Sequence, residues 1–160
     1  MAQKKLSYDQ FVEAVNPTNH PFVQALNSYL QDNGCKATYE AKKTGLLGSY
    51  KHTKTKKSII NLLQKDRGLL VRIYGENSGK YLDFLNTLPD AMVQEIDSAG
   101  DCGRLVSNTC SPKCSGYDVV IKDKRYQKCR YSGFEFLVTD ETGPYIRSFV
   151  EHEVNGRFAV

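Results

Sequence analysis

The sequence contains no tryptophan and only two methionines, and no apolar run approaches the roughly 18 residues that a membrane-spanning helix requires. We therefore expect no membrane-embedded part. No apolar segment follows the two lysines near the start, so we expect no secretory signal peptide either. Five cysteines are few for a small secreted scaffold, which favours a cytoplasmic location where disulfides are disfavoured.

Common signatures of catalysis are also absent. The chain has no G-x-S-x-G, H-E-x-x-H or dinucleotide-binding motif, and its acidic residues are too scattered to select a general acid–base pair. Residues 75–80 resemble a phosphate-binding loop, but the glycines are one residue too close, and Tyr81 stands where a Ser or Thr would bind Mg²⁺. We interpret this segment as a strand-to-helix turn and predict no catalytic residue.

What the sequence does contain is enough apolar material for one folded domain. Of the 160 residues, 40% are apolar and 25% are charged, which is typical of a globular chain. We predict a single domain over residues 1–160, with its ordered core at about 7–154. The tail at 155–160 is expected to be frayed.

Hydrophobic periodicity predicts an α+β fold. Ser7 and Gln10 form a capping box ahead of a first helix, and a second helix is expected to end at Asn33-Gly34. Alternating runs then predict an antiparallel meander, with strands at 35–41, 46–52, 58–64 and 69–74. Helical turns near 81–96, a hairpin at 117–130, a strand at 134–138 and a helix capped by Thr139 follow. The expected architecture is an antiparallel sheet, made of the meander plus the C-terminal hairpin, with helices packed on it.

Positive charge is concentrated in residues 36–72, which carry ten basic and two acidic side chains. Such a one-sided field attracts polyanions. The conventional interpretation is that the lysines line the wet faces and turns of strands, where they also prevent edge pairing. The alternative is a nucleic-acid-binding surface, which is less favoured because no recognised motif accompanies the charge. Its candidate residues are Lys51, Lys54, Lys56, Lys57 and Arg67.

Four cysteines form the most informative group: Cys102, Cys110, Cys114 and Cys129, spaced Cys-x7-Cys-x3-Cys-x14-Cys. Four thiolates suit a tetrahedral structural Zn²⁺, which would fix the irregular loop at 102–116. Other interpretations stay open. The cysteines are alternatively half-buried thiols, a redox pair formed by Cys110 and Cys114, disulfides, or iron–sulfur ligands. Cys35 is expected to serve packing.

Tyrosine is abundant, with ten residues, and several tyrosines fall in or beside predicted strands. Tyrosines on a sheet face with arginines nearby suggest a concave site for a planar or anionic small molecule. The residues that we select are Tyr50, Arg72, Tyr74, Arg130 and Tyr131. The competing interpretation is amphipathic packing at sheet edges.

The order of elements, with the strand Gly-Leu-Leu-Val-Arg-Ile-Tyr at 68–74 and the strand Tyr-Gln-Lys-Cys-Arg-Tyr at 126–131, resembles small bacterial α+β domains of the YdhG-like and YjbR-like kind. The stretch Cys110–Tyr131 also resembles a bacterial family of conserved hypothetical proteins. The resemblance spans roughly residues 7–154. It implies a bacterial cytoplasmic protein and transfers no activity.

From the sequence we therefore predict a non-catalytic binding module with a structural zinc site on four cysteines. The expected ligand is a small molecule in the tyrosine-lined concavity or an acidic partner on the basic segment. The alternatives are a nucleic-acid-binding protein and a thiol redox enzyme or sensor.

Overall fold

The first helix begins, and the second helix ends, where the sequence predicts. The computed structural model describes residues 4–109, 114 and 116–158. Ser7 Oγ accepts the backbone N–H of Gln10 at 3.1 Å and Gln10 Oε1 accepts that of Ser7 at 2.9 Å, so the capping box is confirmed. It starts α1 (Tyr8–Ala14), and a 3₁₀ turn, η1 (Pro17–Asn19), leads into α2 (His20–Asp32). Gly34 follows α2 at φ 81°, a left-handed conformation that glycine adopts without steric cost.

Six strands form one antiparallel sheet in the order β1-β2-β3-β4-β5-β8. Strands β2 to β5 are the predicted meander, and β8 is the strand predicted near 134–138. Only β1 is unexpected, because three residues cannot display a period. The bounds are β1 (Lys4–Leu6), β2 (Cys35–Lys42), β3 (Gly45–His52), β4 (Ser58–Lys65), β5 (Gly68–Ile73) and β8 (Glu135–Leu137).

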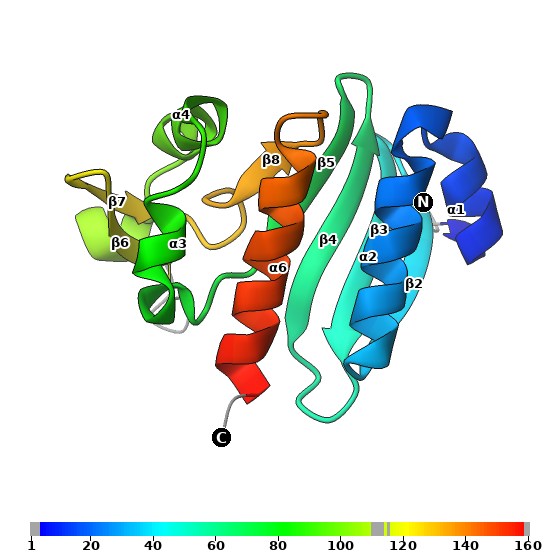
Figure 1. Ribbon diagram of the computed structural model, residues 1–160, viewed down its shortest axis with the longest axis horizontal. Helices are drawn as coiled ribbons and strands as arrows, with labels where there is room; N and C mark the ends of the chain where they lie inside the picture. Colours follow the sequence, from blue (N-terminus) through cyan, green and yellow to red (C-terminus); the bar gives the residue numbers. More distant parts are fainter. Residues whose placement is uncertain (1–3, 110–113, 115, 159–160) are drawn as a thin grey trace.

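Helices α2 and α6 (Gly143–Phe158) lie side by side on one face of this sheet (Figure 1). The strand residues on that face are apolar, with Ile60 opposite Ile73 and Leu62 opposite Val71, and all four are fully buried. Burial of side chains of this size contributes about 1.5–3 kcal/mol each. The layer between the helices and the sheet is therefore the main core.

The described elements between residues 81 and 131 form a smaller unit beside the sheet (Figure 1), which we call the hairpin lobe. It follows a 3₁₀ turn, η2 (Ser78–Lys80). Lys128 ties its parts together, since Nζ donates to the carbonyls of Asp97 and Ala99 at the end of α4 and to Asp101 Oδ1, all at 2.9–3.0 Å. A cation at a helix C-terminus is favourable. The elements are α3 (Leu82–Leu85), α4 (Asp90–Ser98), α5 (Gly103–Val106), β6 (Tyr117–Ile121) and β7 (Lys124–Lys128).

The predicted hairpin, β6–β7, is a sheet of its own and does not extend the meander. The reason is that β6 packs against α3 and β7 against α4 within the hairpin lobe. The α+β class, the single domain and the antiparallel pairing are confirmed. The arrangement in two sheets differs from the single sheet that the sequence suggests.

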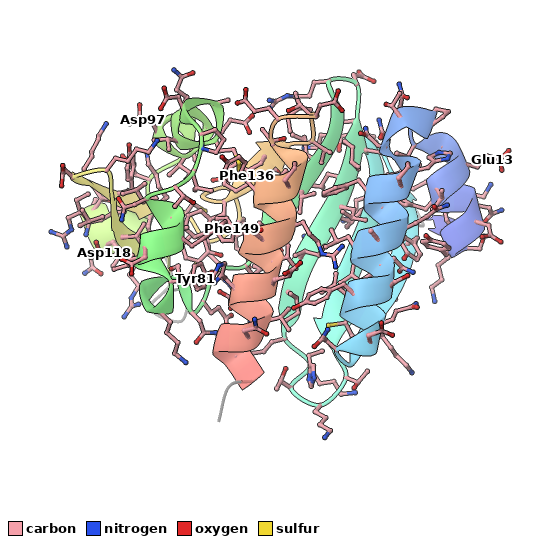
Figure 2. The ribbon with its side chains drawn as sticks, viewed as in Figure 1. Glu13, Tyr81, Asp97, Asp118, Phe136 and Phe149 are labelled. Carbon is pink, nitrogen blue, oxygen red and sulfur yellow. The ribbon has the colours of Figure 1, made fainter. Side chains whose placement is uncertain are left out.

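Aromatic rings join the hairpin lobe to α6 and the sheet. The ring of Phe149 lies 5.7 Å from that of Tyr81, 5.8 Å from Phe84, 5.0 Å from Phe134 and 5.8 Å from Phe136, measured between centroids. Figure 2 shows Tyr81, Phe149 and Phe136 along the side of α6 that faces α3 and β8. Tilted and edge-on pairs at these distances are favourable beyond the area that they bury.

The last helix is longer than expected. The sequence predicts a frayed tail at 155–160, but α6 continues to Phe158. Two hydrogen bonds hold this last turn: Lys80 Nζ donates to the Gly156 carbonyl at 2.9 Å, and Arg157 Nε donates to Glu153 Oε2 at 2.6 Å. In the described residues, no helix is both long enough and apolar enough to span a membrane.

The sheet edge at β8 is covered by side chains. Glu95 Oε2 accepts the Leu137 N–H at 3.0 Å, and Thr142 Oγ1 donates to the Leu137 carbonyl at 2.7 Å. These are backbone groups that point away from β5. Both would otherwise be open to pairing with another strand.

Candidate ligand-binding cleft

A cleft of about 730 Å³ lies where the hairpin lobe meets the sheet. Its wall is formed by the β3–β4 turn, the loop that follows β5, the start of β6 and Arg130. Three basic side chains (Lys56, Lys57 and Arg130) and two acidic ones (Glu76 and Asp118) line it. Clefts at such junctions are the usual sites of small-molecule binding.

The β3–β4 turn places Lys56 and Lys57 at the cleft. His52 Nδ1 accepts the backbone N–H groups of Lys54 and Thr55, at 3.3 and 3.4 Å. The ends of the turn are closed by Lys56 N–H to the His52 carbonyl at 2.9 Å and His52 N–H to the Lys57 carbonyl at 3.0 Å. The turn is thus held by an imidazole acceptor and two backbone bonds, which orders the segment that carries the lysines.

The loop after β5 is fixed from two sides. Gly75 N–H donates to the Tyr117 hydroxyl at 2.9 Å, and a Cβ at Gly75 would lie 2.8 Å from the Phe134 ring, so no larger residue fits. On the other side, the Asn77 backbone N–H and Nδ2 both donate to Glu153 of α6, each at 3.0 Å. The strand-to-helix turn predicted for residues 75–80 is therefore a rigid wall of the cleft.

Arg130 is the best-positioned cation of the cleft. Its guanidinium lies 5.4 Å from the ring centre of Tyr74 and 6.0 Å from that of Tyr131, within the range of cation–π attraction. Nη2 donates to Glu76 Oε1 at 3.0 Å. Nε is buried and has no hydrogen-bond partner among the described residues. The arginine is thus held in place while one of its donors stays unused.

Three of the five predicted ligand-site residues, Tyr74, Arg130 and Tyr131, therefore come together. The other two do not join them. Tyr50 is fully buried on the helix side of the sheet, where its hydroxyl donates to Asn27 of α2 at 2.8 Å, and burial raises the pKa of that hydroxyl well above its usual range. Arg72 pairs with Glu135 of β8 at 3.3 Å.

Tyr117 is a wall residue that the sequence marks only as one of many tyrosines near strands. Besides accepting from Gly75, its hydroxyl lies 3.1 Å from the Arg130 carbonyl, to which it donates. Its ring stacks on Phe134 with centroids 4.4 Å apart. Burial raises the pKa of the Tyr117 hydroxyl, which favours its neutral bridging form. Tyr117 thus connects the hairpin lobe to the segments that follow β5 and precede β8.

The residues proposed for nucleic-acid binding separate into two places. Lys51, Lys54, Lys56 and Lys57 lie at the end of β3 and in the turn after it. Arg67 lies in the β4–β5 turn, at the opposite end of the eight-residue strand β4, which spans about 26 Å. There it donates to Glu95 at 2.8 Å. These five residues do not form one continuous patch.

The cysteines are distributed over several elements. Cys102 and Cys129 lie on adjacent segments, which the antiparallel Asp101–Lys128 bridge pairs, but they are not directly opposite each other. Cys114 is half-buried, and Cys110 lies outside the described residues. Within the described part, no three His, Cys, Asp or Glu side chains are grouped closely enough to hold a metal ion. Cys35 is buried in the core, as the packing role predicts.

No family model, no curated protein and no solved structure matches the chain. The resemblance to YdhG-like and YjbR-like domains stays a prediction.

Proposed function

We propose that the protein is a binding module for a small anionic molecule held in the cleft between the hairpin lobe and the sheet. The observation that carries the proposal is the convergence of Lys56, Lys57 and Arg130 on one hollow. Arginine is suited to this role because its planar donors match carboxylate and phosphate oxygens. A ligand oxygen would bind the guanidinium of Arg130, whose side chain lines the cleft and is 29% exposed.

The site is prepared for binding before a ligand arrives. Tyr74 and Tyr131 fix the Arg130 guanidinium, and the bonds around His52 fix the lysine turn. Because these groups are already ordered, little side-chain entropy is lost on association.

The acidic residues of the lining are engaged in ion pairs, which favours binding over acid–base chemistry. Glu76 pairs with Arg130 at 3.0 Å and with Lys57 at 3.9 Å. Asp118 accepts two bonds from Arg125, at 2.9 and 2.7 Å, which lowers the pKa of its carboxyl. A carboxylate with a lowered pKa is a weak general base.

Arg130→Gln is expected to weaken the binding of inorganic phosphate by roughly 10- to 150-fold, because a hydrogen bond to a charged group contributes about 1.5–3 kcal/mol. Calorimetric titration at low ionic strength would measure this. Arg67→Gln is the matched control, since it removes the same charge at the far end of the sheet. Equal affinities for the two variants, or no saturable binding to the unaltered protein, would contradict the proposal.

The zinc site and the cytoplasmic location remain separate predictions from the sequence. The zinc prediction requires one equivalent of zinc in protein purified without added metal, measured by elemental mass spectrometry. Cys114→Ser should abolish that content, because four thiolates complete a tetrahedral site. A zinc content near zero in the unaltered protein would refute the metal site and leave the anion-binding proposal intact.

A further inference from the structure

A second, smaller hollow of about 320 Å³ adjoins the cleft. Thr55, Lys57, Glu76, Asn77 and Arg157 line it. Lys57 and Glu76 belong to both linings, so the two hollows meet across this ion pair. At 3.9 Å between Lys57 Nζ and Glu76 Oε2, the pair is long and weak.

Arg157 brings a buried cation to the second hollow. Its side chain is only 7% exposed. Nε donates to Glu153 at 2.6 Å and Nη2 to the Tyr74 carbonyl at 2.6 Å. Nη1 is also buried and finds no hydrogen-bond partner in the part of the chain that the structure describes. A buried donor on a charged group without an acceptor is unfavourable. Because Arg157 lines the hollow, an anion bound there would offset this cost.

The same feature therefore occurs in both hollows: an arginine fixed by its neighbours, with one buried nitrogen left unpaired. Together the two linings hold four basic side chains, Lys56, Lys57, Arg130 and Arg157, against the acids Glu76 and Asp118. Asp118 is already bound to Arg125. Arg157 is likewise paired with Glu153, so the excess positive charge lies in the cleft, on Lys56, Lys57 and Arg130 against Glu76. The second hollow contributes the unpaired Nη1 of Arg157.

We propose that the ligand carries two anionic groups, one received by Arg130 and Lys56 in the cleft and the other by Arg157 in the second hollow, with Lys57 between them. This inference rests on the proposed function and narrows it to dianionic small molecules. Phosphoanhydrides and dicarboxylates share this chemistry. Binding through two groups on one molecule is tighter than binding through one, because the second contact becomes intramolecular.

The test compares single and paired anions on the full-length protein at constant ionic strength: phosphate with pyrophosphate, and acetate with glutarate. Pyrophosphate is expected to bind at least tenfold more tightly than phosphate if the ligand is a phosphoanhydride. Glutarate is expected to bind at least tenfold more tightly than acetate if the ligand is a dicarboxylate. If neither pyrophosphate nor glutarate bound at least threefold more tightly than its single counterpart, the inference would be overturned.

A charge placed at the second hollow provides the sharper test, because Arg157→Gln risks unfolding the protein. Thr55→Glu is expected to reduce the affinity for the preferred paired anion at least tenfold while changing that for its single counterpart less than threefold. Thr55→Gln controls for the loss of the hydroxyl, and Thr53→Glu controls for a negative charge elsewhere in the same turn. If Thr55→Glu lowered the affinities for single and paired anions equally, the protein would have only one anion site. That result would refute this inference but not the proposed function. If the unaltered protein binds none of the four anions, both fail.

Discussion

Replacing Glu153 by alanine is expected to lower the free energy of unfolding by about 3–5 kcal/mol, the usual cost of removing one partner from a buried ion pair. The carboxylate is fully buried and accepts four bonds. Two come from Asn77, one from the Tyr81 hydroxyl at 2.6 Å and one from Arg157. Its loss would leave the Arg157 charge buried without a counterion. Urea denaturation would measure the change.

Glu151→Ala is the matched control on the same helix. Glu151 forms an i,i+4 pair with Arg147 at 3.0 Å, and its side chain is 42% exposed, so its removal should cost no more than about 0.5 kcal/mol. Comparable losses for the two variants would show that the buried network does not stabilise the fold. Hydrogen exchange should also reveal faster opening of the 75–80 loop in the Glu153 variant, since that loop loses its anchor to α6.

Phe149→Ala is expected to destabilise the protein by about 3–5 kcal/mol, as is usual for truncating a core phenylalanine. Phe149 is fully buried, and its ring meets four others from α3, β8 and the segments beside them. The cavity would open at the junction between the hairpin lobe and α6. Chemical denaturation would measure the change in the free energy of unfolding. Amide hydrogen exchange in β6 and β7 would report whether the junction between the hairpin lobe and α6 has loosened.

Phe149→Leu separates loss of volume from loss of the ring. Leucine keeps most of the buried volume, so the expected cost is about 1–1.5 kcal/mol. If Phe149→Ala were as stable as the unaltered protein, the aromatic cluster would not be the contact that joins the hairpin lobe to α6.

Local sequence patterns predicted the helices and strands well, because the formation of these elements depends on residues that are close in the sequence. The capping box at Ser7 and the four strands of the meander follow from side-chain bonds and alternation within a few positions. The separation into two sheets depends on contacts far apart in the sequence, such as β6 with α3. Similarly, the extension of α6 depends on Lys80, which lies 76 residues before its acceptor at Gly156.

The candidate site was predictable only in part. Tyr74, Arg130 and Tyr131 lie together, whereas Tyr50 lies on the face of the sheet that α2 covers. Strand alternation does not say which face helices will cover, and a register irregularity after Tyr50 further obscures the pattern. Arg157 carried no signal in the sequence, because its importance arises from burial beside Glu153 and the loop after β5.

The side chains that cover β8 limit how the molecule can associate with its own copies. An incoming strand would need the Leu137 N–H and carbonyl, which already bond to Glu95 and Thr142. Two hydrogen bonds would have to break before one intermolecular ladder could form. Growth of the sheet into larger assemblies is thus opposed at this border by the folded chain itself, and this opposition does not depend on whether the cleft is occupied.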